Sequence, residues 1–154
     1  MRARILVRVQ KESFDVAAEA AKLTQGRTDI GALVSFTGLC RDEGGALAAL
    51  EIEHYPGMAE AEINRAAVEA AARWPLEGAL AVHRYGLIYP GEPIVLVIAA
   101  SVHRGEAFAA ASFLMDYLKT EAPFWKKRHS AGKGAGDWVE AKAQDEAAAQ
   151  KWRT

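Results

Sequence analysis

The chain has 154 residues, 51% of them hydrophobic and 25% charged, and its 19 Lys and Arg against 20 Asp and Glu leave a formal net charge of −1. This length and balance predict one globular domain spanning residues 1–154. A near-neutral chain has no global basic field, which argues against generic nucleic-acid binding. The longest apolar run, residues 93–102, is too short to span a membrane, and the N-terminus lacks a signal-peptide pattern. A cytoplasmic protein without a membrane or nucleic-acid partner is therefore expected.

The N-terminal segment predicts a strand followed by a helix. Residues 5–9 alternate apolar and polar side chains, the period of a half-buried strand. Ser13 is then expected to be the N-cap of a short helix over residues 14–23 that ends near Gly26.

Two more strands and a long helix are expected next. The strands cover residues 32–37 and 47–54, with a turn at the glycine pair 44–45 between them. An alanine-rich helix begins after Pro56 and stops at Pro75. One face of this helix carries the expected core residues, which are Ile63, Ala66, Ala67, Ala70 and Trp74.

The C-terminal half predicts two strands, at residues 79–85 and 94–102, and a helix over residues 106–121. Residues 132–136 are glycine-rich and predict a flexible loop, and residues 141–152 are prone to form a helix. The core stripe expected for the helix over 106–121 consists of Phe108, Ala111, Met115 and Leu118. Five strands interleaved with three or four helices predict an α+β domain.

A corner near residue 123 carries the most distinctive chemistry. Lys119 lies in the last turn of the predicted helix, because Pro123 cannot continue it. Phe124 and Trp125 follow, and then Lys126. Two lysines around an aromatic pair can form a partly desolvated cationic pocket, which suits an anionic substrate. The same spacing also fits solvated lysines beside two core aromatics, and spacing alone does not decide between them.

A second cationic pair follows the strand over 94–102. His103 and Arg104 stand where this strand gives way to a helix, and helix N-termini favour anions such as phosphate. A structural histidine beside a solvated arginine fits the same pattern, so the residues alone leave both interpretations open.

Metal and thiol chemistry find little support in the sequence. Cys40 is the only cysteine, which excludes an intrachain disulfide and a CxxC redox pair, and it is expected to be a small buried residue. His54 and His83 are isolated on strands without metal-ligand spacing, so both are interpreted as structural. No metal and no other cofactor is assigned.

The chain resembles the large, catalytic subunit of molybdopterin synthase over residues 31–141. The resemblance rests on the order and spacing of several short motifs, which are Phe36-Thr37-Gly38 with Arg41, residues 50–58, Arg73-Trp74-Pro75-Leu76, His83-Arg84-Tyr85-Gly86, Tyr89-Pro90-Gly91-Glu92, Ser101-Val102-His103-Arg104, residues 115–126 and Trp138-Val139-Glu140-Ala141. It implies an α/β hammerhead-like fold, with a mixed or antiparallel sheet and flanking helices.

The resemblance also implies an activity and a partner. The family converts cyclic pyranopterin monophosphate (precursor Z) into molybdopterin by installing a dithiolene. The sulfur arrives as a thiocarboxylate on the C-terminal glycine of a small ubiquitin-like subunit, whose tail enters the pocket of the large subunit. A homodimer carrying one small subunit at each active site, a heterotetramer, is implied as well, and Trp74, Tyr85 and Tyr89 are candidate interface aromatics.

Roles for individual residues follow from the resemblance. Lys119 would stabilise the oxyanion at the incoming glycine, and Lys126 would act as general acid/base or as an electrostatic clamp. Arg41, His103 and Arg104 would hold the substrate phosphate. The further expected substrate-binding residues are Lys127 and Arg128, as anion-steering or partner-contacting cations, and Phe36, as a pocket wall.

Two other functions fit the same cationic residues. One is a lysine Schiff-base lyase acting on a phosphorylated carbonyl compound, with Lys119 as the nucleophile. The other is a non-catalytic module that binds a ubiquitin-like tail, which leaves the clustered cations unexplained.

Overall fold

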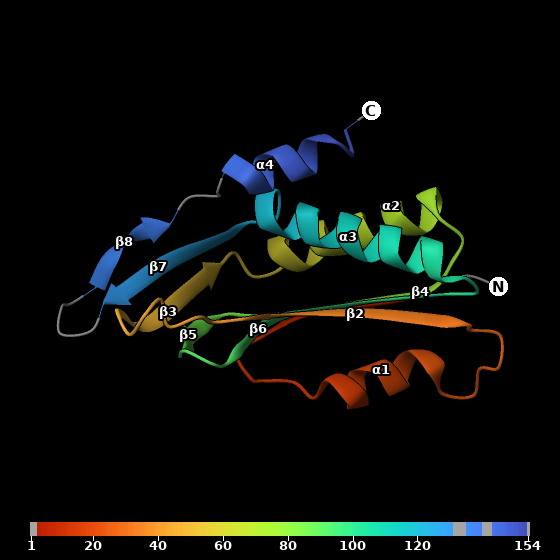
Figure 1. Ribbon diagram of the computed structural model, residues 1–154, viewed down its shortest axis with the longest axis horizontal. Helices are drawn as coiled ribbons and strands as arrows, with labels where there is room; N and C mark the ends of the chain where they lie inside the picture. Colours follow the sequence, from red (N-terminus) through yellow and green to blue (C-terminus); the bar gives the residue numbers. More distant parts are fainter. Residues whose placement is uncertain (1–2, 131–134, 140–142, 154) are drawn as a thin grey trace.

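The computed structural model describes residues 3–130, 135–139 and 143–153, and within them the chain forms two four-stranded sheets with helices packed around them (Figure 1). The elements in chain order are β1 (Arg4–Gln10), α1 (Val16–Thr24), β2 (Ala32–Leu39), β3 (Leu47–His54), α2 (Met58–Arg73), β4 (Leu76–Arg84), β5 (Gly86–Ile88), β6 (Pro93–Ser101), α3 (Arg104–Thr120), β7 (Phe124–Ser130), β8 (Ala135–Val139) and α4 (Ala143–Gln150). This architecture confirms the predicted α+β class with a mixed sheet and flanking helices.

The first sheet forms a central layer with the strand order β1-β4-β6-β2. Strands β1 and β4 are parallel, whereas β6 runs antiparallel to both of its neighbours. Helix α1 covers one face, and α2 and α3 cover the other (Figure 1). Residues 80 and 82 of β4 pack with Leu23 of α1, whereas residues 79 and 81 pack in the cluster that holds α2 and α3. Side chains therefore alternate between the two faces, as the pleat of a strand requires.

The two long helices bury alanine-rich faces against this sheet. Ile63, Ala66, Ala67 and Ala70 of α2 are each at most 2% exposed, as predicted. The stripe predicted for α3 is partly wrong, because Phe108 is 61% exposed. The buried face of α3 instead contains Ala107, Ala110, Ala111, Phe113, Leu114 and Leu118.

The second sheet has the order β5-β3-β7-β8 and lies at one end of the molecule (Figure 1). The sequence predicted β3 but none of the three other strands, so five strands were expected and eight are described. Pro123 ends the helical stretch as predicted, and the chain then pairs β7 with β3 in antiparallel register. The predicted loop over residues 132–136 lies mainly outside the described residues, and its last two positions belong to β8.

The N-cap of helix α1 differs from the residue that the sequence predicted. Helix α1 is capped by Asp15, whose Oδ1 accepts a hydrogen bond from the Ala18 amide at 3.0 Å, so the predicted Ser13 cap was wrong. A carboxylate accepts this bond as well as a hydroxyl does and also suits the positive end of the helix dipole.

None of the helices in the described part of the chain is long and apolar enough to cross a bilayer.

Candidate active site

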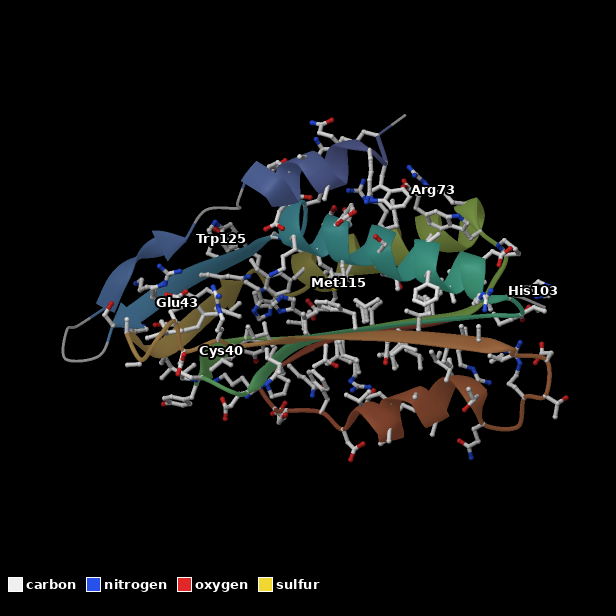
Figure 2. All side chains as sticks on the ribbon, viewed as in Figure 1. Cys40, Glu43, Arg73, His103, Met115 and Trp125 are labelled. Carbon is white, nitrogen blue, oxygen red and sulfur yellow. The ribbon has the colours of Figure 1, made fainter. Side chains whose placement is uncertain are left out.

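A pocket of about 300 Å³ lies where the end of the central sheet, the end of α3 and the start of β7 meet. Met115 reaches it from α3, from the layer between that helix and the sheet (Figure 2). The pocket is lined by Gly38, Leu39, His83, Ile94, Val95, Met115, Leu118, Lys119, Thr120, Ala122, Phe124, Lys126 and Asp145. It is called the lysine pocket here, because Lys119 and Lys126 both belong to it.

Lys119 is placed in this pocket by the end of α3. Met115, Leu118 and Lys119 stand at helical positions i, i+3 and i+4, so they share one face of the helix. Leu118 is buried and fixes this turn against the core, whereas Lys119 is exposed. The last turn of a helix carries a partial negative charge, which favours a cation at this position.

Lys126 reaches the same pocket from β7. Phe124 and Lys126 are two residues apart on this strand, so they point to the same side of the sheet. Lys126 is half-buried and lies opposite Ile52 of β3, which is 1% exposed. The two lysines thus come from separate elements, and the proline break between them sets the change of direction.

The pocket holds a buried histidine that the sequence interpretation assigned to structure alone. His83 is 5% exposed, and its ring stacks on Phe124 with centroids 3.8 Å apart and planes 13° from parallel. Its Nδ1 lies 2.8 Å from the carbonyl oxygen of Arg84. Burial, reinforced by the positive charges of Lys126 and Lys119, lowers the pKa of His83 to about 3, although the Arg84 carbonyl acts in the opposite direction. His83 is therefore a neutral imidazole at physiological pH.

An acidic residue completes the polar lining. Asp145, near the start of α4, is half-buried and lines the pocket beside the two lysines. No pattern in the sequence pointed to this carboxylate, because the C-terminal segment is recognisable only as charged and helix-prone. The pocket therefore combines two cationic side chains, one carboxylate and one buried imidazole.

The other predicted residues of this region lie around the pocket. Phe36 and Gly38 of β2 point to the α3 side of the central sheet, opposite Val97 and Val95 of β6. Gly38 lines the pocket, but Phe36 does not and is 44% exposed. Arg41 is exposed, two residues after the pocket residue Leu39.

The two cations that follow Lys126 are not part of the pocket lining. Lys127 points to the face of β7 opposite Lys126, because neighbouring residues of a strand alternate. Arg128 forms an ion pair with Glu43 in the loop between β2 and β3, at 2.9 Å. Their predicted roles in anion steering or partner contact stay predictions.

His103 and Arg104 lie far from the lysine pocket within one chain. His103 is the N-cap of α3 and Arg104 its first residue, and both are exposed. Lys119 stands fifteen positions later on the same helix, about 22 Å away at 1.5 Å per residue. Figure 2 shows His103 at the start of α3, well away from Met115, which lines the pocket. One protomer therefore does not bring this pair and the two lysines together.

The single thiol is not available for sulfur chemistry in this conformation. Cys40 is 3% exposed, and its Sγ faces the carbonyl oxygen of Ile88 at 3.8 Å. Burial, together with the charges of Glu92 and Glu43, raises the pKa of the Cys40 thiol, so it stays protonated. Within the described ranges, no three His, Cys, Asp or Glu side chains are grouped to hold a metal ion.

Comparison with known proteins gives a consistent result. The family model described as MoaE protein matches residues 9–121. A molybdopterin synthase catalytic subunit from Mesorhizobium japonicum is 66% identical over 148 residues, covering 96% of this chain and 93% of the relative. A molybdopterin biosynthesis MoaE protein from Burkholderia ambifaria superposes with a TM-score of 0.83 at 44% identity, covering 100% of this chain and 99% of that one.

A more distant structure shares the fold. It comes from a complex of subunits 1 and 2 of the molybdopterin-converting factor from Helicobacter pylori, with a TM-score of 0.71 at 17% identity, covering 90% of this chain and 91% of that one. The extent of the family match and the identity to the Mesorhizobium relative decide the assignment. The chain belongs to the MoaE protein family, the catalytic subunits of molybdopterin synthase.

Proposed function

We propose that this chain converts cyclic pyranopterin monophosphate into molybdopterin, with sulfur delivered by the thiocarboxylated C-terminus of a small ubiquitin-like subunit. The observation that carries the proposal is the convergence of Lys119 and Lys126 on one pocket of about 300 Å³. Two ammonium groups in a partly desolvated site stabilise the negative charge that develops when a nucleophile attacks an acyl carbon. A cytoplasmic place of action is part of this proposal.

The two lysines are assigned different tasks. Lys119 lies at the exposed side of the pocket and stabilises the oxyanion at the glycine carbonyl of the incoming tail. Lys126 is half-buried and serves as general acid/base or as a second electrostatic clamp. The sulfur comes from the partner, which agrees with the buried, protonated state of Cys40.

The small subunit supplies the chemical group that this chain lacks. A chain of the same fold occurs in the Helicobacter pylori complex of subunits 1 and 2 of the molybdopterin-converting factor. The proposal requires the same kind of assembly here, with an extended tail reaching into the lysine pocket.

Phosphate binding by His103 and Arg104 requires a second copy of the chain. Strand β2 is at the edge of the central sheet, and its eight residues, ALVSFTGL, contain neither a charge nor a proline. Natural edge strands usually carry such residues, which discourage pairing with another chain. Leu33, Phe36 and Leu39 of this strand are more than 40% exposed, as expected of a surface that a partner strand covers.

Antiparallel pairing of two β2 strands about a twofold axis would complete the site. The first residue of β2, Ala32, lies opposite Ser101, two positions before His103, whereas its last residues, Gly38 and Leu39, line the lysine pocket. Antiparallel pairing sets the start of one strand beside the end of the other. It would therefore bring His103 and Arg104 of one copy towards the lysines of its partner.

Two experiments test these proposals. The purified protein is mixed with precursor Z and a thiocarboxylated small subunit, and dithiolene product is measured; absence of product from folded, partner-bound protein would refute the activity. For the shared site, Lys119→Ala and Arg104→Ala chains are denatured together and refolded. Mixed dimers then contain one intact site and regain turnover, whereas a site built within one chain gives no recovery.

A further inference from the structure

We propose that His83 is a positioning residue of the lysine pocket, whose Nε2 accepts a hydrogen bond from the side-chain ammonium of Lys126 and holds that ammonium in place. The inference rests on the proposed function and adds a residue that the sequence interpretation had treated as structural. It is carried by the hydrogen bonding of the imidazole, by the direction of the strands that meet at the pocket and by the absence of charge on the ring.

The hydrogen bonding of the ring determines which nitrogen carries the proton. A carbonyl oxygen can only accept a hydrogen bond, so the 2.8 Å contact with Arg84 requires Nδ1 to be the donor. In a neutral imidazole, Nε2 is then the acceptor. No buried side-chain nitrogen or oxygen in the described part of the chain lacks a partner. Nε2 is therefore either accessible to solvent or already bonded to a partner.

The strands bring the side chains of His83 and Lys126 to the same pocket. Residues 79, 81 and 83 of β4 share one side of the strand, and residues 79 and 81 pack on the side of α2 and α3. His83 thus points to this side at the last turn of α3, where β7 crosses. Phe124 stacks on the imidazole at 3.8 Å, and Lys126 is the next β7 residue on the same side as Phe124.

The charges around the ring favour an acceptor over a proton carrier. The groups that face it are Lys126 from β7, Lys119 from α3 and His54 from β3, and each of them disfavours a positive imidazole. Asp145 of α4 also lines the pocket. With the pKa of His83 lowered to about 3, the ring remains neutral while an ammonium stands beside it. A neutral acceptor can orient that ammonium without the like-charge repulsion that a protonated histidine would cause.

The test compares two substitutions of His83 in the enzyme assembled with its small subunit. His83→Phe keeps a ring that can stack on Phe124 but removes the acceptor, whereas His83→Gln keeps an oxygen near the position of Nε2. We expect His83→Phe to lower kcat at least about tenfold with little change in KM, and His83→Gln to restore most of it. The basic limb of the pH–rate profile should move to lower pH in His83→Phe alone, because the ammonium form of Lys126 loses its acceptor.

Two control variants separate positioning from folding. His54→Phe changes another histidine near Phe124, with ring centroids 6.1 Å apart, that is not among the pocket residues, and it should leave the pH–rate profile unchanged. Asp145→Asn tests the other acceptor of the pocket. An unchanged profile in His83→Phe, or the same shift in Asp145→Asn alone, would overturn the proposal.

A spectroscopic readout does not depend on turnover. Side-chain ¹⁵N NMR of the wild-type protein should show His83 protonated at Nδ1 and unprotonated at Nε2 down to mildly acid pH. A proton on Nε2 would refute the proposal even in an active enzyme. Conversely, a wild-type protein with this tautomer and no synthase activity would refute the proposed function and leave the arrangement of His83 in place.

Discussion

The imidazole of His83 lies flat against the phenyl ring of Phe124, with centroids 3.8 Å apart. The first residue belongs to β4 in the central sheet and the second to β7 in the other sheet, so this stack joins the two sheets at the lysine pocket. Phe124 is also 6.1 Å from His54, which contacts Tyr85 at 4.3 Å. A row of four rings thus runs from the pocket lining, at His83 and Phe124, to His54 and Tyr85 outside it.

The buried imidazole predicts a specific loss of stability in acid. Burial lowers the pKa of His83 from 6.5 to about 3, so the unfolded chain binds a proton in this window that the folded chain does not. Above pH 6.5, the pKa of this histidine in the unfolded chain, the group leaves the free energy of unfolding at its full value. As the pH falls from 6.5 towards 3, the free energy of unfolding declines by about 1.4 kcal/mol per pH unit. Urea unfolding of the wild type and of His83→Phe at a series of pH values measures it. The variant should show a flatter acid limb, and equal slopes would contradict the assignment.

Replacing Lys119 should remove most turnover without unfolding the protein. Lys119→Ala loses a cation that stabilises the developing oxyanion, an effect of about 100- to 1000-fold on kcat for one such donor. Because Lys119 is exposed, the variant should keep its circular dichroism spectrum and its affinity for the small subunit. Lys119→Arg should rescue poorly, since a guanidinium is broader than an ammonium and does not readily exchange a proton. Wild-type turnover in Lys119→Ala would exclude the role.

The pair of lysines can be tested as a unit. Lys126→Ala should also be severely impaired, because both side chains line the same pocket. If both act in one transition state, the double variant is far less defective than the product of the two single effects. Single-turnover rates of the four proteins provide the measurement. Strictly multiplicative losses would assign the lysines to separate steps, such as one for each sulfur transfer.

Loss of the arginine at the start of α3 should affect one ligand more than the other. Arg104→Ala removes a forked cation expected to hold phosphate, which is worth about 1.5–3 kcal/mol for a charge-assisted hydrogen bond. Binding of precursor Z should weaken by that amount, while binding of the small subunit is retained. Isothermal titration with each ligand separates the two, and Arg65→Ala on the exposed surface of α2 serves as the control. Equal losses for both ligands would indicate a fold or interface defect.

The interface aromatics proposed from sequence show how context changes an interpretation. Trp74 packs edge-on against Phe113 and Trp152 within the chain, and Tyr85 packs against His54, so both already have intramolecular contacts. Tyr89 is 51% exposed. The apolar residues of β2 are stronger candidates for a contact between copies, because they combine exposure with a position at the edge of the sheet that the described strands form.

The sequence by itself determined the features that depend on neighbours along the chain. Apolar periodicity identified β3 and the buried face of α2, and Pro123 identified the end of the helical stretch that carries Lys119. The order of the motifs identified the family. These signals are local, since periodicity and proline geometry act over a few residues.

Only the tertiary structure decided which of these residues meet. β7 consists of Phe-Trp-Lys-Lys-Arg-His-Ser, a run too polar to predict as a strand. It is held by pairing with β3, whose residues lie 70 to 83 positions earlier than their β7 partners. That long-range pairing brings Lys126 and Phe124 to Lys119 and His83, and the length of α3 keeps His103 and Arg104 away from them in the same chain. Strand pairing depends on the hydrogen-bonding edge that a distant segment provides, and no local pattern in either segment specifies it.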